Sequence, residues 1–504
     1  NYRKRNMDLI KEIVLTFSES DKKEFEQFLT RKRPGAKRKD VEVFRYLYLV
    51  YNGIKTSKNE LSGDQNYHAV RKRISKELTH FLILKKSISE QNVHKREAMV
   101  LMILYFIERN KYNVAWELLN KEERNAERVK NIDLNLKIQR LKLTILPYFN
   151  QEKFPAIKKK MMELQLRISK IDEFQLYFIQ VKNDLKLKIA QGSVASPSEI
   201  IKNALAQYNN IKSEYNNPVI HLKVIEIIRA EYILNRKFKV FAEVAQKYYN
   251  DFLPEIFKSD SHINTFAQIE YIMSYTFLNA REFKKSLHHL SKLEGLMSQS
   301  QIVKDNFQGK HVAIASFIKV FDHQIHDAIQ SIESFLLNEV KKISVQEYLN
   351  LSLNLAGYLI IVRDYSKAAK IFNFMSEPNS YYQKEMGREW LIRKEMILCI
   401  VQTSLGNTEF SLKILSSIEK KHTEMLKIEQ YSMVNHFIRL IRNFIHKPHE
   451  ANLNDLIQFE KSIELNKEKV FRDPRLIIFY AWLRSQYVNK DAYEILIEEY
   501  QQIS

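Results

Sequence analysis

Apolar residues recur at helical spacing along most of this chain, and short polar breaks separate one apolar segment from the next. The clearest case starts with an apolar segment at 348–362, which predicts a helix. A polar break, Arg363-Asp364, follows it. The next segment, 365–372, begins with an aromatic residue, continues with small residues and ends with a second aromatic. The pattern predicts two antiparallel helices joined by a tight turn.

Related hairpins recur at a nearly constant distance along the sequence. We align them on the small or short residue that opens each second helix. These residues are Ala115, Ile157, Ser286, Ala328, Ala368 and Ser411. The gap from Ile157 to Ser286 is three times as long as the others, so two weaker units are expected within it, near positions 199 and 241. The spacing predicts a repeat of about 42 residues.

A single hairpin exposes an apolar face that it can bury only against its neighbours, and small residues let adjacent helices approach closely. The order of turn, aromatic, small residue and second aromatic resembles the tetratricopeptide repeat. The matching second-helix positions are Tyr365, Ala368 and Phe372, then Phe283, Ser286 and Leu290, and then Tyr112, Ala115 and Leu119. The period exceeds the ~34 residues of that family, and its first-helix Trp and Gly positions are mostly absent. Over roughly residues 99–504, the resemblance implies an all-α fold: an α-solenoid of antiparallel hairpins, wound as a right-handed superhelix whose concave face holds peptides or partner helices.

The start of the chain does not follow this repeat. We expect a basic helical N-terminal block at 1–96 and the repeat array at 97–504. Apolar residues at helical spacing predict three helices in the block, at about 21–30, at 41–51 and from residue 67 onward. Within the array, the segment 193–197 contains Ser and Pro and is the best candidate for a break.

Basic charge is concentrated in the N-terminal block. The chain has a net charge of +20, and residues 1–96 hold 23 Lys and Arg against 12 Asp and Glu. Two clusters stand out, one of Arg31, Lys32, Arg33, Lys37, Arg38 and Lys39, the other of Arg71, Lys72, Arg73 and Lys76. On a small helical bundle, both clusters could share a face that follows the phosphates of DNA or RNA. The alternative is that these lysines and arginines are ordinary solvated surface.

Composition narrows the class of protein further. Only 9 Gly and 9 Pro occur among 504 residues, which argues against all-β folds and against dinucleotide-binding folds rich in turn glycines. The single cysteine, Cys399, excludes an internal disulfide and a cysteine-based zinc site, and its apolar surroundings predict a buried, inert thiol. The chain has no apolar run of the ~18 residues that a membrane span needs. We therefore expect a cytoplasmic protein.

The sequence offers little for catalysis. It contains no phosphate-binding loop motif, no dinucleotide fingerprint and no HExxH motif. His288 and His289 are adjacent, so in a helix they point to different faces and cannot chelate as an i,i+4 pair would. The same geometry separates the carboxylates of Glu122 and Glu123. We predict no catalytic residue, no cofactor and no metal.

Three functions are compatible with the sequence. The first is a non-enzymatic scaffold that holds a protein or peptide partner in its superhelical groove, with Tyr271 and Tyr275 of one first helix lining the concave side. The second is a regulator that responds to a peptide or protein and binds nucleic acid through the basic block. An enzyme on a helical scaffold is a third and weaker possibility, because function resides in sites and no catalytic site is visible.

Overall fold

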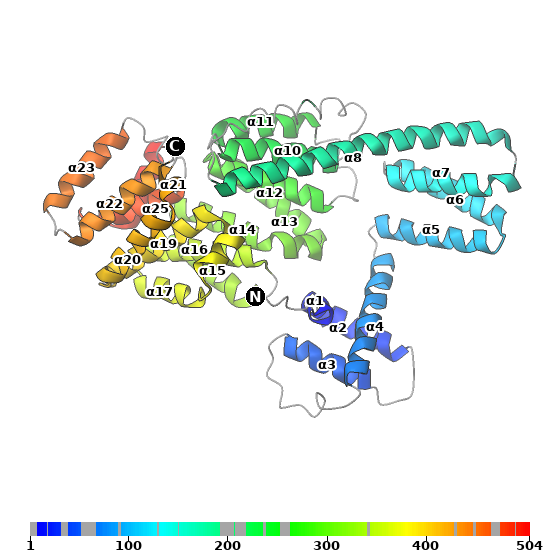
Figure 1. The fold of residues 1–504 in the computed structure, drawn as a ribbon, viewed down its shortest axis with the longest axis horizontal. Helices are drawn as coiled ribbons and strands as arrows, with labels where there is room; N and C mark the ends of the chain where they lie inside the picture. Colours follow the sequence, from blue (N-terminus) through cyan, green and yellow to red (C-terminus); the bar gives the residue numbers. More distant parts are fainter. Residues whose placement is uncertain are drawn as a thin grey trace. The chain divides into compact units, whose positions relative to one another are not determined.

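The protein is helical throughout the part of the chain that the structure describes, and no strand occurs there (Figure 1). The structure is a computed structural model. It describes residues 8–17, 19–31, 39–51, 67–88, 92–128, 131–149, 151–191, 206, 218–234, 238–252, 263–339, 343–427, 431–446, 450–464, 474–488 and 490–503. The prediction of an all-α fold is confirmed. Among these residues, no helix combines the length and the apolar character needed to cross a bilayer.

The chain divides into two compact units. The first comprises Asn1–Asp172 and Ser259–Ser261, and the second comprises Glu173–Lys258 and His262–Ser504. The predicted boundary between residues 96 and 97 stays a prediction. The predicted break at 193–197 lies outside the described residues.

The first unit has two separate apolar cores, one among its first four helices and one among the next three. Its helices are α1 (Leu9–Leu15), α2 (Glu19–Arg31), α3 (Lys39–Tyr51), α4 (Tyr67–Ile88), α5 (Asn92–Glu108), α6 (Tyr112–Arg128), α7 (Ile132–Ile145), the 3₁₀ turns η2 (Leu146–Tyr148) and η3 (Gln151–Lys153), and the first part of α8 (Phe154–Gln191). Helices α2, α3 and α4 lie where the apolar pattern predicts them. The Phe25 ring packs against Phe44 at 4.7 Å and against Phe81 at 5.3 Å between ring centroids.

In the second unit, a large apolar core extends from α12 (Ile263–Asn279) to α26 (Ala492–Ile503) among the described residues. After the end of α8, the helices of this unit are α10 (Pro218–Leu234), α11 (Phe238–Phe252), α12, α13 (Phe283–Gln299), α14 (Gln301–Phe321), α15 (Ile325–Glu339), α16 (Val345–Ile361), α17 (Tyr365–Phe374), α18 (Asn379–Met386), α19 (Arg388–Ser404), α20 (Thr408–Lys421), α21 (Thr423–Leu426), α22 (Ser432–His446), α23 (Glu450–Glu464), α25 (Pro474–Ser485) and α26. Sequential helices pack as pairs: α12 with α13, α14 with α15, α16 with α17, α19 with α20, and α25 with α26.

Among the described residues, five helix-to-helix connections share one turn geometry. Each contains a residue with positive φ, and these residues are Asn110, Arg281, His323, Arg363 and Gly406. The next residue donates its backbone N–H to the carbonyl five positions earlier, as Asp364 does to Leu359 and Asn407 does to Gln402, both at 2.9 Å. This bond closes the end of the first helix as in a Schellman motif. Because four of the five residues are not glycine, these turns do not require a glycine-rich sequence.

A small buried residue follows each of these turns by five positions. These residues are Ala115, Ser286, Ala328, Ala368 and Ser411, and all are fully buried. Two of them also bond to the preceding helix. The Ser286 hydroxyl donates to the Ser274 carbonyl at 2.8 Å, and the Ser411 hydroxyl donates to the Cys399 carbonyl at 3.3 Å. The two pairs have the same separation along the chain, so the paired helices meet at equivalent positions.

Cys399 lies inside this contact. Its thiol donates to the Ser411 carbonyl at 3.7 Å and is completely buried. Burial raises the pKa of Cys399 to about 12. The thiol therefore stays protonated at neutral pH, as expected for an inert, structural cysteine.

The hairpin pattern does not continue through α8. This helix runs for 38 residues without a break, over a stretch where the predicted repeat leads us to expect two shorter helices. Between Ala156 and Gln191 the sequence contains neither Gly nor Pro. No proline interrupts this stretch, so one helix can continue across the predicted repeat spacing.

We predict opposite stability effects for two Gly→Ala substitutions. Gly406 has a φ of +84°, so Gly406→Ala places a side chain in the left-handed region and should cost about 1 kcal/mol. Gly295 lies inside α13 with no atom near an added Cβ, so Gly295→Ala should stabilise by about 0.5–1 kcal/mol. Urea unfolding midpoints measure both. Equal midpoints for Gly406→Ala and the wild type would contradict the turn geometry.

Candidate functional site

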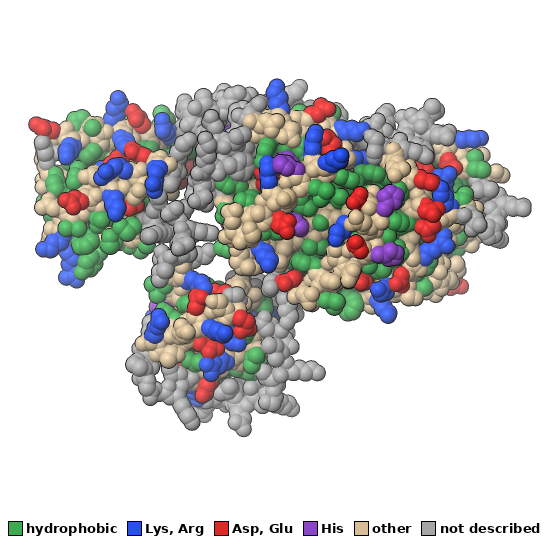
Figure 2. Space-filling model, turned by 180° about the vertical axis from the view of Figure 1, so that it is seen from behind, with side chains coloured by type: hydrophobic (Ala, Val, Ile, Leu, Met, Phe, Trp, Pro, Cys, Tyr) green, Lys and Arg blue, Asp and Glu red, His purple; other side chains and the backbone are tan. Residues whose placement is uncertain are grey.

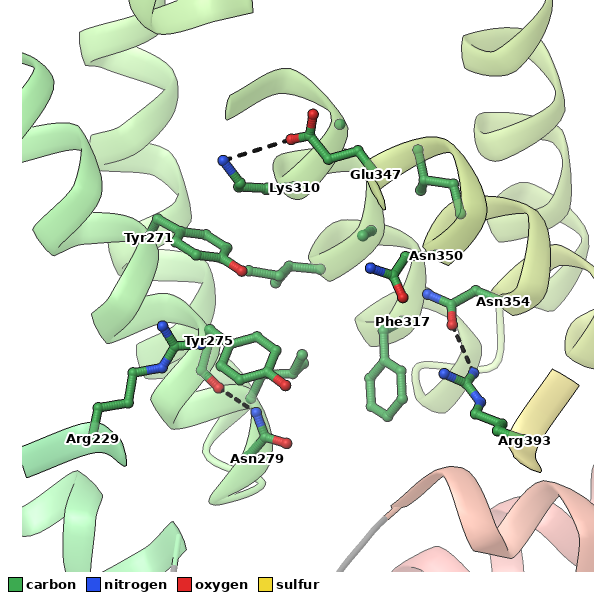
Figure 3. Close-up of a pocket in the computed structure, with 15 residues that line it drawn as sticks. Arg229, Tyr271, Tyr275, Asn279, Lys310, Phe317, Glu347, Asn350, Asn354 and Arg393 are labelled. Carbon is green, nitrogen blue, oxygen red and sulfur yellow. Dashed lines mark hydrogen bonds and ion pairs between the residues drawn. The ribbon is translucent and has the colours of Figure 1, made fainter. Parts of the chain in front are cut away.

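The second unit contains a pocket of about 240 Å³ between five helices (Figure 3). Its lining residues come from α10, α12, α14, α16 and α19. Four of these are the first helices of the packed pairs described above, and α10 packs in the same way against α11. The second helices, α11, α13, α15, α17 and α20, contribute no lining residue. The pocket is therefore built from one layer of the hairpins.

Both tyrosines predicted for the groove, Tyr271 and Tyr275, line this pocket from α12. Their ring centroids are 6.1 Å apart, and the Arg229 guanidinium lies 5.0 Å from the centre of the Tyr275 ring. Burial raises the pKa of Tyr271 to about 12, although nearby Arg229 opposes the shift. The phenol of Tyr271 is thus a neutral donor and acceptor at physiological pH. A role of these tyrosines in binding stays a prediction.

Cationic side chains outnumber acidic ones in the lining, with Arg229, Lys310 and Arg393 against Glu347. Arg229 and Arg393 come from α10 and α19, the first and last of the five helices in chain order. In Figure 3 both lie on the side of the pocket away from Lys310 and Glu347. The pocket therefore has a net positive charge of two, with an ion pair on one side and the two arginines at opposite ends of the other side (Figure 3).

On the ion-pair side, Lys310 and Glu347 lie 3.6 Å apart. The Lys310 ammonium also donates to the Asn306 carbonyl at 2.9 Å and lies 4.6 Å from the centre of the Phe307 ring. Glu347 approaches the backbone of Gly309, where an added Cβ would meet the Glu347 side chain at 3.4 Å. The absence of a side chain at Gly309 thus lets the carboxylate sit against α14.

Amide side chains complete the polar lining. Asn354 accepts a hydrogen bond from Arg393 Nη2 at 2.8 Å, and the Asn279 amide donates to the Tyr275 carbonyl at 2.7 Å. Asn350 lies one helical turn before Asn354 and faces the same space (Figure 3). Asparagine both donates and accepts, so these side chains suit a ligand with peptide groups of its own.

Sequence reasoning missed most of the polar lining. The residues it did not single out are Arg229, Lys310, Glu347, Asn350, Asn354 and Arg393. A signal was available, because Arg229, Tyr271 and Ala313 follow one another at intervals of 42 residues, the length of the predicted repeat, and all three line the pocket. Positions one repeat away from Tyr271 can be identified from the sequence alone.

The basic residues predicted to contact nucleic acid are in several different environments. Lys32, Arg33, Lys37 and Arg38 lie outside the described residues. Arg31 ends α2, and Lys39 starts α3. On α4, Lys72, Arg73 and Lys76 are all exposed, and Arg73 also lies 3.9 Å from Asp40.

Arg71 has a structural partner within the block. Its guanidinium pairs with Asp8 and donates to the Tyr51 hydroxyl at 3.2 Å, while Tyr51 itself donates to Asp8 at 2.6 Å. Burial by itself would raise the pKa of Asp8, but the hydrogen bonds from Tyr51 and Arg71 outweigh it and leave the pKa lowered. Arg71 therefore ties α4 to the end of α3 and the start of α1.

The face shown in Figure 2 has no continuous field of Lys and Arg over the described residues. Blue and red side chains alternate there, including on the N-terminal block at the bottom of the view. Within the block, Arg45 forms an ion pair with Glu26, and Lys85 forms one with Glu24. Nucleic-acid binding by the block stays a prediction.

We predict that Arg71 and Lys72 differ in their effect on the block. Arg71→Ala removes a half-buried ion pair and should lower local stability by about 1 kcal/mol, allowing for partial exposure of the pair. The exposed neighbour Lys72→Ala should change stability by less than about 0.5 kcal/mol. Hydrogen exchange of α3 and α4 in the full chain measures both. Unchanged exchange in Arg71→Ala would show that the Asp8–Tyr51–Arg71 contact does not hold the block together.

Two further observations concern chemistry. His289, one of the adjacent histidines, is buried and bonds through Nδ1 to Glu270 at 2.7 Å. Within the described ranges, no group of three or more His, Cys, Asp or Glu side chains is arranged to hold a metal ion.

In comparisons with known proteins, no family model and no curated protein matches the chain.

Proposed function

We propose that this protein is a non-enzymatic binding protein that holds a segment of a protein or peptide partner in the pocket of its second unit. The observation that carries the proposal is that first helices alone line the pocket. In tetratricopeptide-like superhelices, which the sequence resembles, the first helices form the concave face. The proposal includes that architecture, a solenoid with a period of about 42 residues.

The positions of the lining residues support a repeat-based groove. Arg229, Tyr271 and Ala313 are each 42 residues apart, and Asn350 and Arg393 are 43 apart. Within each of these two sets, successive hairpins contribute equivalent positions to the pocket. Repeat proteins typically build extended binding surfaces in this way, because each unit adds a similar strip next to the last.

The chemistry of the lining favours an extended chain with acidic character. Neutral tyrosine and asparagine side chains offer hydrogen bonds to peptide groups, and the arginines offer charge-assisted bonds to carboxylates. Helix α14 contributes apolar contact to the pocket through Ala313, Ile314 and Phe317. A few polar groups around an apolar surface are typical of sites that bind a specific ligand.

Site-specific photo-crosslinking tests the proposal. A photoreactive phenylalanine at Tyr275 should crosslink a partner in cells of the source organism, whereas the same group at Phe374 should not. Phe374 is 77% exposed on α17, a second helix outside the pocket, and serves as a matched control. Mass spectrometry identifies the attached segment.

A second variant makes the result specific to the pocket. Arg393→Gln removes one cation and its bond to Asn354, and we expect it to reduce the Tyr275 crosslink about tenfold, because a charge-assisted bond is worth about 1.5 kcal/mol or more. Equal crosslinking from positions 275 and 374, or a Tyr275 crosslink unaffected by Arg393→Gln, would argue against a partner in this pocket.

A further inference from the structure

The carboxylate of Glu347 is held in place by the start of its own helix. Ser344 caps α16, and Glu347 completes a capping box: its Oε2 accepts from the Ser344 backbone N–H at 3.1 Å and from the Ser344 hydroxyl at 3.0 Å. Its side chain is only 14% exposed. These two bonds hold the carboxylate of Glu347 beside the pocket.

The other oxygen of this carboxylate faces Lys310. Glu347 Oε1 is buried and has no hydrogen-bond donor among the described residues, and the Lys310 ammonium is 3.6 Å from it. The ammonium instead donates to the Asn306 carbonyl. Lys310 is therefore attracted to Glu347 but makes no hydrogen bond to it, and its long side chain can rotate. Glu347, in contrast, is held by the capping box.

Glu347 also affects the electrostatics of the pocket centre. Tyr271 lies between the two charged sides, and its pKa is raised by burial first and by the Glu347 charge as well, while Arg229 lowers it. The side of the pocket near Glu347 thus disfavours a second anion, and the side near Arg229 favours one.

We propose that Glu347 determines the specificity of the pocket. Its carboxylate neutralises the Lys310 ammonium, so the acidic groups of a bound peptide pair with Arg229 and Arg393 and not with Lys310. This inference rests on the proposed function, because it assumes a peptide in the pocket. It limits the ligand to peptides whose acidic groups all lie toward the arginine side. A peptide with a further carboxylate near Lys310 would meet the fixed charge of Glu347.

The test uses the full chain and a defined pool of short peptides with blocked ends, which carry one, two or three aspartates at varied positions. Enrichment on immobilised wild type and Glu347→Gln is read by mass spectrometry, and affinities of selected peptides by calorimetry. Glutamine keeps the capping box, since its side chain can accept the same bonds. We expect Glu347→Gln to bind peptides with an additional aspartate about tenfold more tightly, and peptides with one aspartate within about threefold of wild type.

Two further variants show whether the gain comes from Lys310. In the double variant Lys310→Met/Glu347→Gln, the tighter binding of peptides with an additional aspartate should vanish, because the Lys310 ammonium that would pair with that aspartate is gone. Glu347→Ala removes the carboxylate without the amide and should reproduce the gain. The matched control is Glu333→Gln, which breaks a 3.5 Å ion pair with Lys367 outside the pocket and should leave peptide selection unchanged.

The outcomes separate this inference from the proposed function. If neither wild type nor any variant retains peptides, both are overturned. If wild type retains acidic peptides in an Arg393-dependent way but Glu347→Gln shows no gain for additional aspartates, only the role of Glu347 is overturned. A gain that persists in the double variant would equally overturn it, because Lys310 would not be the group released.

Discussion

The close contact between the two helices of each hairpin is the constraint on which the rest of the second unit depends. A left-handed residue ends the first helix, and five residues later a small buried residue brings the second helix against the first. Where that residue is serine, it bonds to the backbone of the first helix, as Ser286 does to Ser274 and Ser411 does to Cys399. A larger side chain would separate the helices and shift the register of every later hairpin.

This contact also explains why the pocket is polar. The first helices are packed by their own partners and by neighbouring hairpins, so most of their residues are apolar and buried, as over much of α16 and α19. A polar residue is stable there only where it can reach solvent or a bonding partner. Asn350, Asn354 and Arg393 meet this condition at the pocket. The polar lining thus falls on a part of these helices where the pocket gives such side chains space and partners.

Local packing and long-range packing differ in how far the sequence reveals them. Helix pairs and their turns were predictable because apolar periodicity and small residues depend on local packing, and each anchor residue, from Ala115 to Ser411, is indeed buried. Tyr271 could be placed in the pocket wall only through the repeat analogy. Arg393 and Glu347 could not, since each looks like an ordinary charged residue of a helix until the spacing of neighbouring helices is known. The continuous helix α8 was also missed, because the repeat spacing predicts hairpins even where no residue stops a helix.

The N-terminal block shows why a count of charges does not establish a binding surface. Residues 1–96 carry a large excess of Lys and Arg, but a cation attracts phosphate strongly only where it is accessible and not already neutralised. Arg71 is half-buried against Asp8, and Lys85 lies against the acidic start of α2. Such pairs fold the block, and they remove charge from the surface that a phosphate backbone could reach. The exposed Lys72 differs in this respect, so the distinction between structural and available cations must be made residue by residue.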